Sequence, residues 1–85
     1  MKKLKITRVG GLVTELSITP SAEYAFELYA KKGFHKAFRE DEKQSDLYWL
    51  AWELIRASGE TVDINLPVFI ATLVDVEVLD DSPLE

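Results

Sequence analysis

Asp-Leu-Tyr-Trp-Leu-Ala-Trp-Glu-Leu-Ile-Arg-Ala-Ser-Gly, residues 46–59, contains both tryptophans of the chain. Apolar side chains recur here three and four positions apart, as they do on one face of an α-helix. The residues of this face are Leu47, Leu50, Ala51, Leu54, Ile55 and Ser58. Ser45 or Asp46 can cap the start, and Gly59 suits the position after the end, where a left-handed backbone costs glycine little. The pattern predicts one long central helix around which the rest of the chain packs.

The apolar side of this helix is wider than packing against a single core requires. At about 100° per residue, Tyr48 and Trp52 extend the apolar arc well beyond the stripe of ~100° that an ordinary surface helix presents. Trp49 falls outside the arc, on the side of Glu53 and Arg56. Either the helix is clamped on several sides within its own fold, or it offers aromatic surface to a partner.

The composition describes one small domain without disulfide bonds. The chain has 85 residues and no cysteine, which excludes a disulfide framework, a cysteine-based zinc site and a cysteine nucleophile. Its formal net charge is −5, and no lysine or arginine follows Arg56. We expect no nucleic acid partner, because phosphate binding needs a basic surface. We expect no membrane anchor either, because no apolar run approaches the ~20 residues that span a bilayer.

Two alternating runs around a glycine pair predict an N-terminal β-hairpin. Residues 4–8 and 13–18 alternate apolar and polar side chains, and the Gly10-Gly11 pair between them can adopt the positive φ of a tight turn. Residues 73–79 also alternate, with valines on one side and acids on the other, which predicts a C-terminal strand. We expect this strand beside the hairpin, where basic side chains of the hairpin would face its acids. These basic residues are Lys3, Lys5 and Arg8.

Helical signals fill the chain between the hairpin and the last strand. Thr19 is a good N-cap in front of a proline, and we expect the helix that follows to end at Gly33. Its broad apolar side is formed by Tyr24, Ala25, Phe26, Leu28 and Tyr29. A helical turn over residues 34–38 and a short helix from Leu66 onward are also expected. The charged run 39–45 is either a loop or the exposed start of the central helix.

Together these elements predict an α+β fold, a small and mainly helical domain with an N-terminal β-hairpin and a C-terminal strand. We expect a single domain over residues 1–79. The acidic end of the chain, residues 80–85, is expected to fray, because nothing in its composition ties it to a core.

The sequence contains no recognisable catalytic or metal-binding arrangement. Its one histidine, His35, stands four residues before the cation Arg39 rather than beside a carboxylate, and no serine has a histidine in a recognisable triad. The acidic run Glu40-Asp41-Glu42 lacks the glycine and the alternating oxygen ligands of a calcium loop, so we expect a solvated loop there. We therefore expect no enzyme, no cofactor and no metal site.

Three motifs resemble the small tail assembly chaperones of long-tailed bacteriophages, and they occur in the same order. The first, residues 16–20, is a strand that runs into Thr-Pro and then a helix. The second is Asp-Leu-Tyr-Trp-Leu-Ala-Trp at residues 46–52, with Ala-Ser-Gly at residues 57–59. The third is Leu-Val-Asp-Val-Glu-Val at residues 73–78. Each motif is short, and their common order covers nearly the whole chain.

The resemblance implies a non-catalytic role in phage tail assembly in the host cytoplasm. Chaperones of this family coat the apolar, helical tape measure protein in many copies until tail tube subunits replace them. A longer form made by ribosomal frameshifting is common in the family and recruits the tail tube protein. The resemblance thus implies the tape measure protein as partner, the tail tube protein through such a longer form, and self-association. A structural tail component or a small protein-binding regulator is the alternative.

Aromatic residues are the predicted contacts with such a partner. We predict that Tyr48, Trp49, Trp52 and Phe38 bind it, because Trp and Tyr are enriched at protein interfaces. Trp49→Ala should leave folding nearly intact and weaken association with the client or with other copies.

Overall fold

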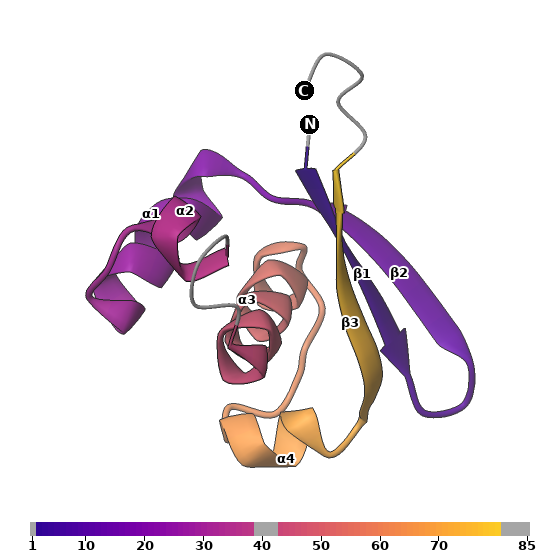
Figure 1. The fold of residues 1–85 in the computed structure, drawn as a ribbon. Coiled ribbons are helices and arrows are strands. Elements are labelled where there is room, and N and C mark those ends of the chain that lie inside the picture. Colours follow the sequence, from indigo (N-terminus) through magenta and orange to yellow (C-terminus); the bar gives the residue numbers. More distant parts are fainter. Residues whose placement is uncertain (1, 39–42, 81–85) are drawn as a thin grey trace.

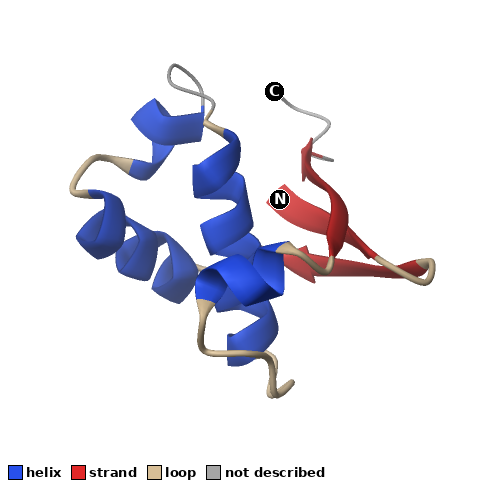
Figure 2. Ribbon diagram, turned by 90° about the horizontal axis from the view of Figure 1, so that it is seen from below, coloured by secondary structure: helices blue, strands red, loops and turns tan. Residues whose placement is uncertain are grey.

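The fold is an antiparallel sheet with helices packed on one of its faces (Figures 1 and 2). The structure, a computed structural model, describes residues 2–38 and 43–80. Over these residues the elements are β1 (Lys2–Arg8), β2 (Leu12–Ser17), α1 (Pro20–Ala30), α2 (Phe34–Lys36), α3 (Gln44–Ala57), α4 (Leu66–Ile70) and β3 (Leu73–Asp80). The predicted α+β fold, with its N-terminal hairpin and C-terminal strand, is confirmed.

The first strand is the centre of the sheet, whose order is β2-β1-β3. Gly10 and Gly11 both have positive φ, +93° and +85°, as the predicted hairpin turn requires. Lys5 lies opposite Glu15 of β2 and Glu77 of β3. The predicted pairing of hairpin cations with acids of the last strand is therefore confirmed at Lys5, on the sheet face away from the helices.

A β-bulge interrupts the pairing between β1 and β3. The register shifts between Thr7 and Arg8, so that Arg8 lies opposite Leu73 instead of Val74, and neither of these residues is an acid. The bulge also ends the regular alternation of β3, because Val74 is exposed while Val76 is buried. The predictions that Arg8 faces an acid of β3 and that the valines of this strand share one side are wrong at these positions.

The end of α1 lies two residues before the predicted one, because the left-handed residue that ends the helix is Lys31 and not Gly33. Lys31, not Gly33, adopts the left-handed backbone, with φ +58°, and its N–H donates to the Glu27 carbonyl at 2.9 Å. Gly33 instead precedes α2, where the Phe34 N–H donates to Glu27 Oε2 at 2.9 Å. Glu27 thus holds both sides of the corner between the two helices, so the corner does not depend on glycine.

The central helix begins earlier than predicted and ends where it was expected. Its N-cap is Lys43, not Ser45 or Asp46, and Gly59 follows its end with φ +100°. Asp46 is buried in the first turn, where its Oδ2 lies 3.2 Å from Lys32 Nζ. A carboxylate in this position also interacts favourably with the helix dipole. The ion pair therefore joins the end of α1 to the start of α3.

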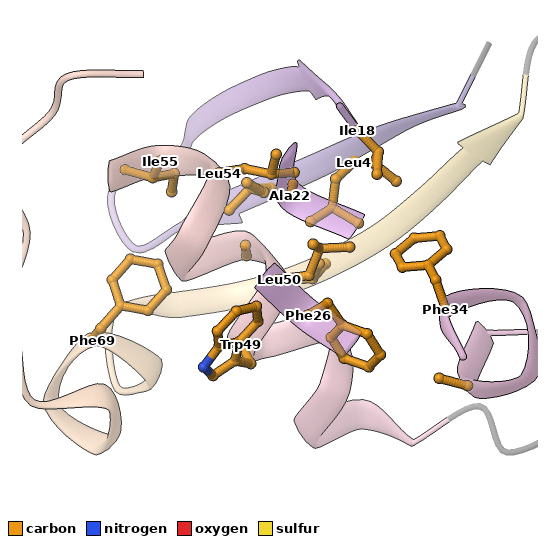
Figure 3. Close-up of a cluster of buried hydrophobic side chains, with 14 residues drawn as sticks. Leu4, Ile18, Ala22, Phe26, Phe34, Trp49, Leu50, Leu54, Ile55 and Phe69 are labelled. Carbon is orange, nitrogen blue, oxygen red and sulfur yellow. The ribbon is translucent and has the colours of Figure 1, made fainter. Parts of the chain in front are cut away.

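The hydrophobic core lies on both sides of α3 (Figure 3). On the sheet side, Leu50 and Ile55 belong to the same buried cluster as Leu4 of β1, and on the other side Trp49 packs with Phe26 of α1. All of these side chains are buried. The wide apolar arc of the helix is thus explained by the first of the two interpretations, in which α3 is clamped on several sides within its own fold.

Two predictions fall wholly or partly on residues outside the described ranges. Most of the charged run 39–45 lies there, because residues 39–42 are not described. The acidic tail expected over residues 80–85 also lies outside, apart from Asp80, which is the last residue of β3.

The N-cap of α1 offers a direct test of the local energetics. Thr19 Oγ1 accepts a hydrogen bond from the Ala22 N–H at 3.1 Å, as the sequence predicts. Thr19→Ala should lower the free energy of unfolding by about 1 kcal/mol, because it leaves an amide of the first turn without its partner. Urea unfolding monitored by circular dichroism measures the change. The control is Ser21→Ala at an exposed position of the same turn, and equal stability of the two variants would contradict the cap.

Candidate functional site

Trp49 belongs to the core and not to the surface. Only 8% of it is exposed. Its indole ring stacks on the ring of Tyr29, with 4.5 Å between centroids and 11° between planes, and meets the Phe26 ring at 6.0 Å and 64°. The expectation that Trp49→Ala leaves folding nearly intact does not fit these surroundings. The helical wheel placed Trp49 outside the core arc because it could not include the packing of α1 on that side.

Trp52 holds a loop of its own chain. Its Nε1–H donates to the Asp63 carbonyl at 2.9 Å, and the guanidinium of Arg56 lies 4.4 Å from the ring centroid. Asp63 Oδ1 in turn accepts a hydrogen bond from the Asn65 N–H at 2.8 Å. The half-buried indole therefore fixes the connection between α3 and α4. The hydrogen bond to Asp63 also satisfies the indole N–H, which is the one polar group of the side chain.

Phe38 lines a surface groove of about 290 Å³ between the helices and β3. We call it the Phe38 groove, and its lining residues are Phe38, Gln44, Leu47, Val76, Glu77 and Val78. The Phe38 ring itself packs on Phe26 and Phe34, with centroid distances of 4.9 and 4.6 Å. The inner part of the ring thus belongs to the core, while the half-buried side chain contributes an apolar wall to the groove.

The four predicted contact residues do not form one surface. Tyr48 is half-buried against the core cluster, Trp49 is enclosed and Trp52 holds a loop. Phe38 is the one among them that lines the Phe38 groove. That these four residues bind a partner stays a prediction. Among them, Phe38 is better placed for binding than the two tryptophans, because it lines a groove at the surface.

A second groove, of about 300 Å³, lies between the hairpin turn, α4 and the loop that precedes α4. We call it the hairpin-tip groove. Its apolar lining includes Val9, Leu12 and Val68, all of which are exposed, and its rim carries Arg8, Glu60 and Asp63. Sequence reasoning missed this groove. Its one early signal was the pair of apolar residues, Val9 and Leu12, on either side of a hairpin turn, where polar residues are usual.

A bidentate ion pair closes one side of the hairpin-tip groove. Arg8 Nη1 donates to Glu60 Oε2 at 2.6 Å, and Nη2 donates to Oε1 at 3.0 Å. These hydrogen bonds are the main cause that lowers the pKa of Glu60 and raises the pKa of Arg8. The Arg8 side chain is largely buried, whereas the Glu60 side chain stays partly open to solvent. The pair therefore ties the loop after α3 to the end of β1.

The first helix is apolar on two sides. Ala22 and Phe26 face the core, while Tyr24 and Leu28, one helical turn apart, are exposed on the opposite side. The prediction that Tyr24, Leu28 and the core residues share one apolar side is wrong, because the helix turns these two away from Phe26. We call Tyr24, Leu28 and the exposed Lys31 the outer face of α1.

The described residues give no support for catalysis, metal binding or a membrane span. His35 is exposed, and its ring meets that of Phe34 edge-on at 6.0 Å. Within residues 2–38 and 43–80, no group of three or more His, Asp or Glu side chains is placed to hold a metal ion. The predicted solvated run 40–42 lies outside these ranges. No helix in the described part of the chain is long and apolar enough to cross a membrane.

Comparison with protein-family models, curated proteins and solved structures finds no match to this chain. The fold and its grooves therefore carry the functional argument together with the sequence motifs.

Burial of Trp49 leads to a quantitative prediction. Trp49→Ala should lower the free energy of unfolding by about 3–5 kcal/mol, because it removes a large core side chain and leaves a cavity against Tyr29 and Phe26. Tyr24→Ala, at an exposed aromatic position, should change it by no more than about 0.5 kcal/mol. Urea unfolding followed by circular dichroism measures both. If Trp49→Ala destroys folding outright, Trp49→Phe should fold and show an intermediate loss.

The Arg8–Glu60 ion pair predicts a pH dependence of stability. Because the pKa of Glu60 is lower in the folded than in the unfolded chain, the unfolded state binds more protons and stability rises with pH. The contribution is complete above the unfolded pKa of about 4.3 and disappears as pH falls through the lowered folded value. Glu60→Gln should therefore reduce the slope with which stability falls as pH is lowered below about 5. Urea midpoints at several pH values measure this, and an unchanged slope in the variant would contradict the pairing.

Proposed function

We propose that this chain is a non-catalytic tail assembly chaperone of a long-tailed bacteriophage. In this proposal, many copies bind apolar helical segments of the tape measure protein in the host cytoplasm and keep them soluble until the tail tube assembles. A longer form made by frameshifting would recruit the tail tube protein. The three sequence motifs support the family, and the Phe38 groove is the structural observation that carries the proposal.

The Phe38 groove has the chemistry that an apolar helix needs. One wall comes from Phe38 and Leu47 on the helical side, and the other comes from Val76 and Val78 of β3. Such a groove accepts the apolar face of an amphipathic helix, whose anchors lie three and four residues apart. Glu77 keeps the rim charged beside these apolar walls.

The small size of the groove favours action in many copies. A single contact of this size binds weakly, but repeated contacts along one client raise the effective concentration of every further contact. The formal net charge of −5 would keep coated complexes apart through mutual repulsion. Both features fit a coat protein that must later be replaced.

Co-expression with the tape measure protein encoded nearby tests the proposal. Sizing with light scattering should find a soluble complex that holds many copies of this chain per client. An insoluble client beside free small protein would overturn the chaperone function. Detection of the chain in purified virions would instead favour a structural tail component.

Two valines of the same strand provide a matched pair of variants. Val78→Glu places a charge in the Phe38 groove, whereas Val74→Glu adds the same charge at an exposed position of β3 that does not line it. We expect Val78→Glu to lower the yield of soluble client at least tenfold and Val74→Glu to leave it unchanged, with both variants folded by circular dichroism. Equal yields would place the client elsewhere on the chain.

A further inference from the structure

The outer edge of β2 lacks the features that usually protect the edge of a sheet. β2 stands at one end of the order β2-β1-β3, and among the described residues no strand pairs with its outer side (Figure 1). It contains one charged residue, Glu15, and no proline, and its register with β1 runs from Leu12 to Ser17 without a bulge. Such an edge presents alternate backbone N–H and C=O groups away from its neighbour, and these form a template for a further strand.

The opposite edge of the sheet is better protected. β3 carries two acids in its middle, Asp75 and Glu77, and its pairing with β1 is interrupted by the bulge at Val74. Charged side chains and bulges are two of the devices by which proteins prevent an edge strand from pairing with another chain. The sheet therefore has one protected and one unprotected edge, and a further strand is expected beside β2.

A third groove, of about 270 Å³, lies beside the unprotected edge. We call it the β2-edge groove, and its lining residues are Leu16, Ser17, Thr19, Leu54, Ala57 and Ser58. No residue of β1 or β3 lines it, so the groove lies on the outer side of β2. Leu16 pairs with the buried Leu4 and thus belongs to the sheet face that the helices cover. A side chain of an added strand beside Leu16 would point to the same face and enter the groove.

The other face of the sheet favours a cation beside β2. Lys5 of β1 lies opposite Glu15 on one side and opposite Glu77 on the other, so two acids share one cation in this row. The next residue in the row belongs to the added strand, and a lysine or arginine there would meet Glu15 from its open side. The C-terminal end of α3, at Ala57, also borders the groove and favours positive charge through the helix dipole.

We propose that the outer edge of β2 binds an extended segment of another protein as a fourth strand. The segment alternates apolar residues, which face the β2-edge groove, with polar residues that include a cation beside Glu15. Main-chain hydrogen bonds hold the segment, while the groove and Glu15 select its side chains. This site lies at the other edge of the sheet from the Phe38 groove and shares no lining residue with it. The inference therefore goes beyond the proposed client binding and does not depend on it.

A synthetic heptapeptide, Val-Lys-Val-Lys-Val-Lys-Val with blocked ends, tests the site. It is titrated at physiological salt into the isotope-labelled chain, while amide resonances and hydrogen exchange are recorded. Two derivatives carry N-methyl groups, one on all lysines and the other on all valines. In an added strand the N–H groups of alternate residues point towards β2 and away from it. Methylation of one set therefore removes the hydrogen bonds to β2, whereas methylation of the other set leaves them intact.

Strand addition predicts a specific pattern of results. The peptide should slow hydrogen exchange at residues 12–17, and one of the two methylated derivatives should lose binding while the other keeps it. Ala57→Lys fills the groove and should weaken binding about tenfold, whereas Ala71→Lys, at the exposed end of α4, should leave the affinity unchanged. Glu15→Gln should weaken binding about threefold, and Asp75→Asn, on the same face but at the far strand, should not. Circular dichroism confirms that each variant is folded.

Other outcomes overturn the proposal. The site is excluded if the peptide does not bind at millimolar concentration. Equal binding of both methylated derivatives indicates attraction between side chains without an added strand, and slowed exchange confined to residues 73–80 places the strand at the opposite edge. Equal affinity of the Ala57→Lys and Ala71→Lys variants removes the groove from the site. If exchange at residues 12–17 slows as the concentration of the chain alone rises, β2 pairs with a second copy and is not a site for another protein.

Discussion

The structure depends on covering α3 from two sides. The three-stranded sheet covers one side through Leu4 and Ile6, and α1 covers the other through the stack of Tyr29 on Trp49. A chain of this length buries only a little over ~60% of the surface that it exposes when unfolded, so a single apolar interface would leave it with little stability. The second layer on α3 adds apolar contact on the side that the sheet does not cover. Trp49 is the side chain that makes this second layer possible.

The covering of α3 from two sides also determines which apolar side chains stay exposed to solvent. Because no further layer packs on the far side of α1 within the described chain, Tyr24 and Leu28 stay exposed, although both belong to residue types that usually contribute to cores or interfaces. The same limit applies at the hairpin turn, where Val9 stays 67% exposed although it lines a groove with Val68 of α4. In a domain this small, surface apolar groups are a consequence of having few layers, and they become the surfaces through which the domain can bind.

Local signals in the sequence predicted much of the fold, and the failures share one cause. The glycine pair and the Thr19 cap each act through neighbours in the chain, so their structural result follows from the sequence. Trp49 was misplaced because a helical wheel ranks the faces of one helix by its own residues and ignores what packs against them. The hairpin-tip groove could not be foreseen either, since it joins Arg8 to Glu60 across 52 positions of the chain. Candidate sites built by long-range contacts need the fold, whereas the Gly10-Gly11 turn and the Thr19 cap do not.

Charge placement beside the apolar grooves limits which partners they accept. Glu77 stands in the lining of the Phe38 groove, and Glu60 with Asp63 stands at the rim of the hairpin-tip groove. A purely apolar segment that covers Glu77 or Asp63 would remove a carboxylate from water without supplying a cation, which costs free energy. A segment with a lysine or arginine at the edge of its apolar face avoids that cost and gains attraction. In the proposed function, Glu77 would therefore favour client segments that carry a cation at the border of their apolar face over segments that are purely apolar.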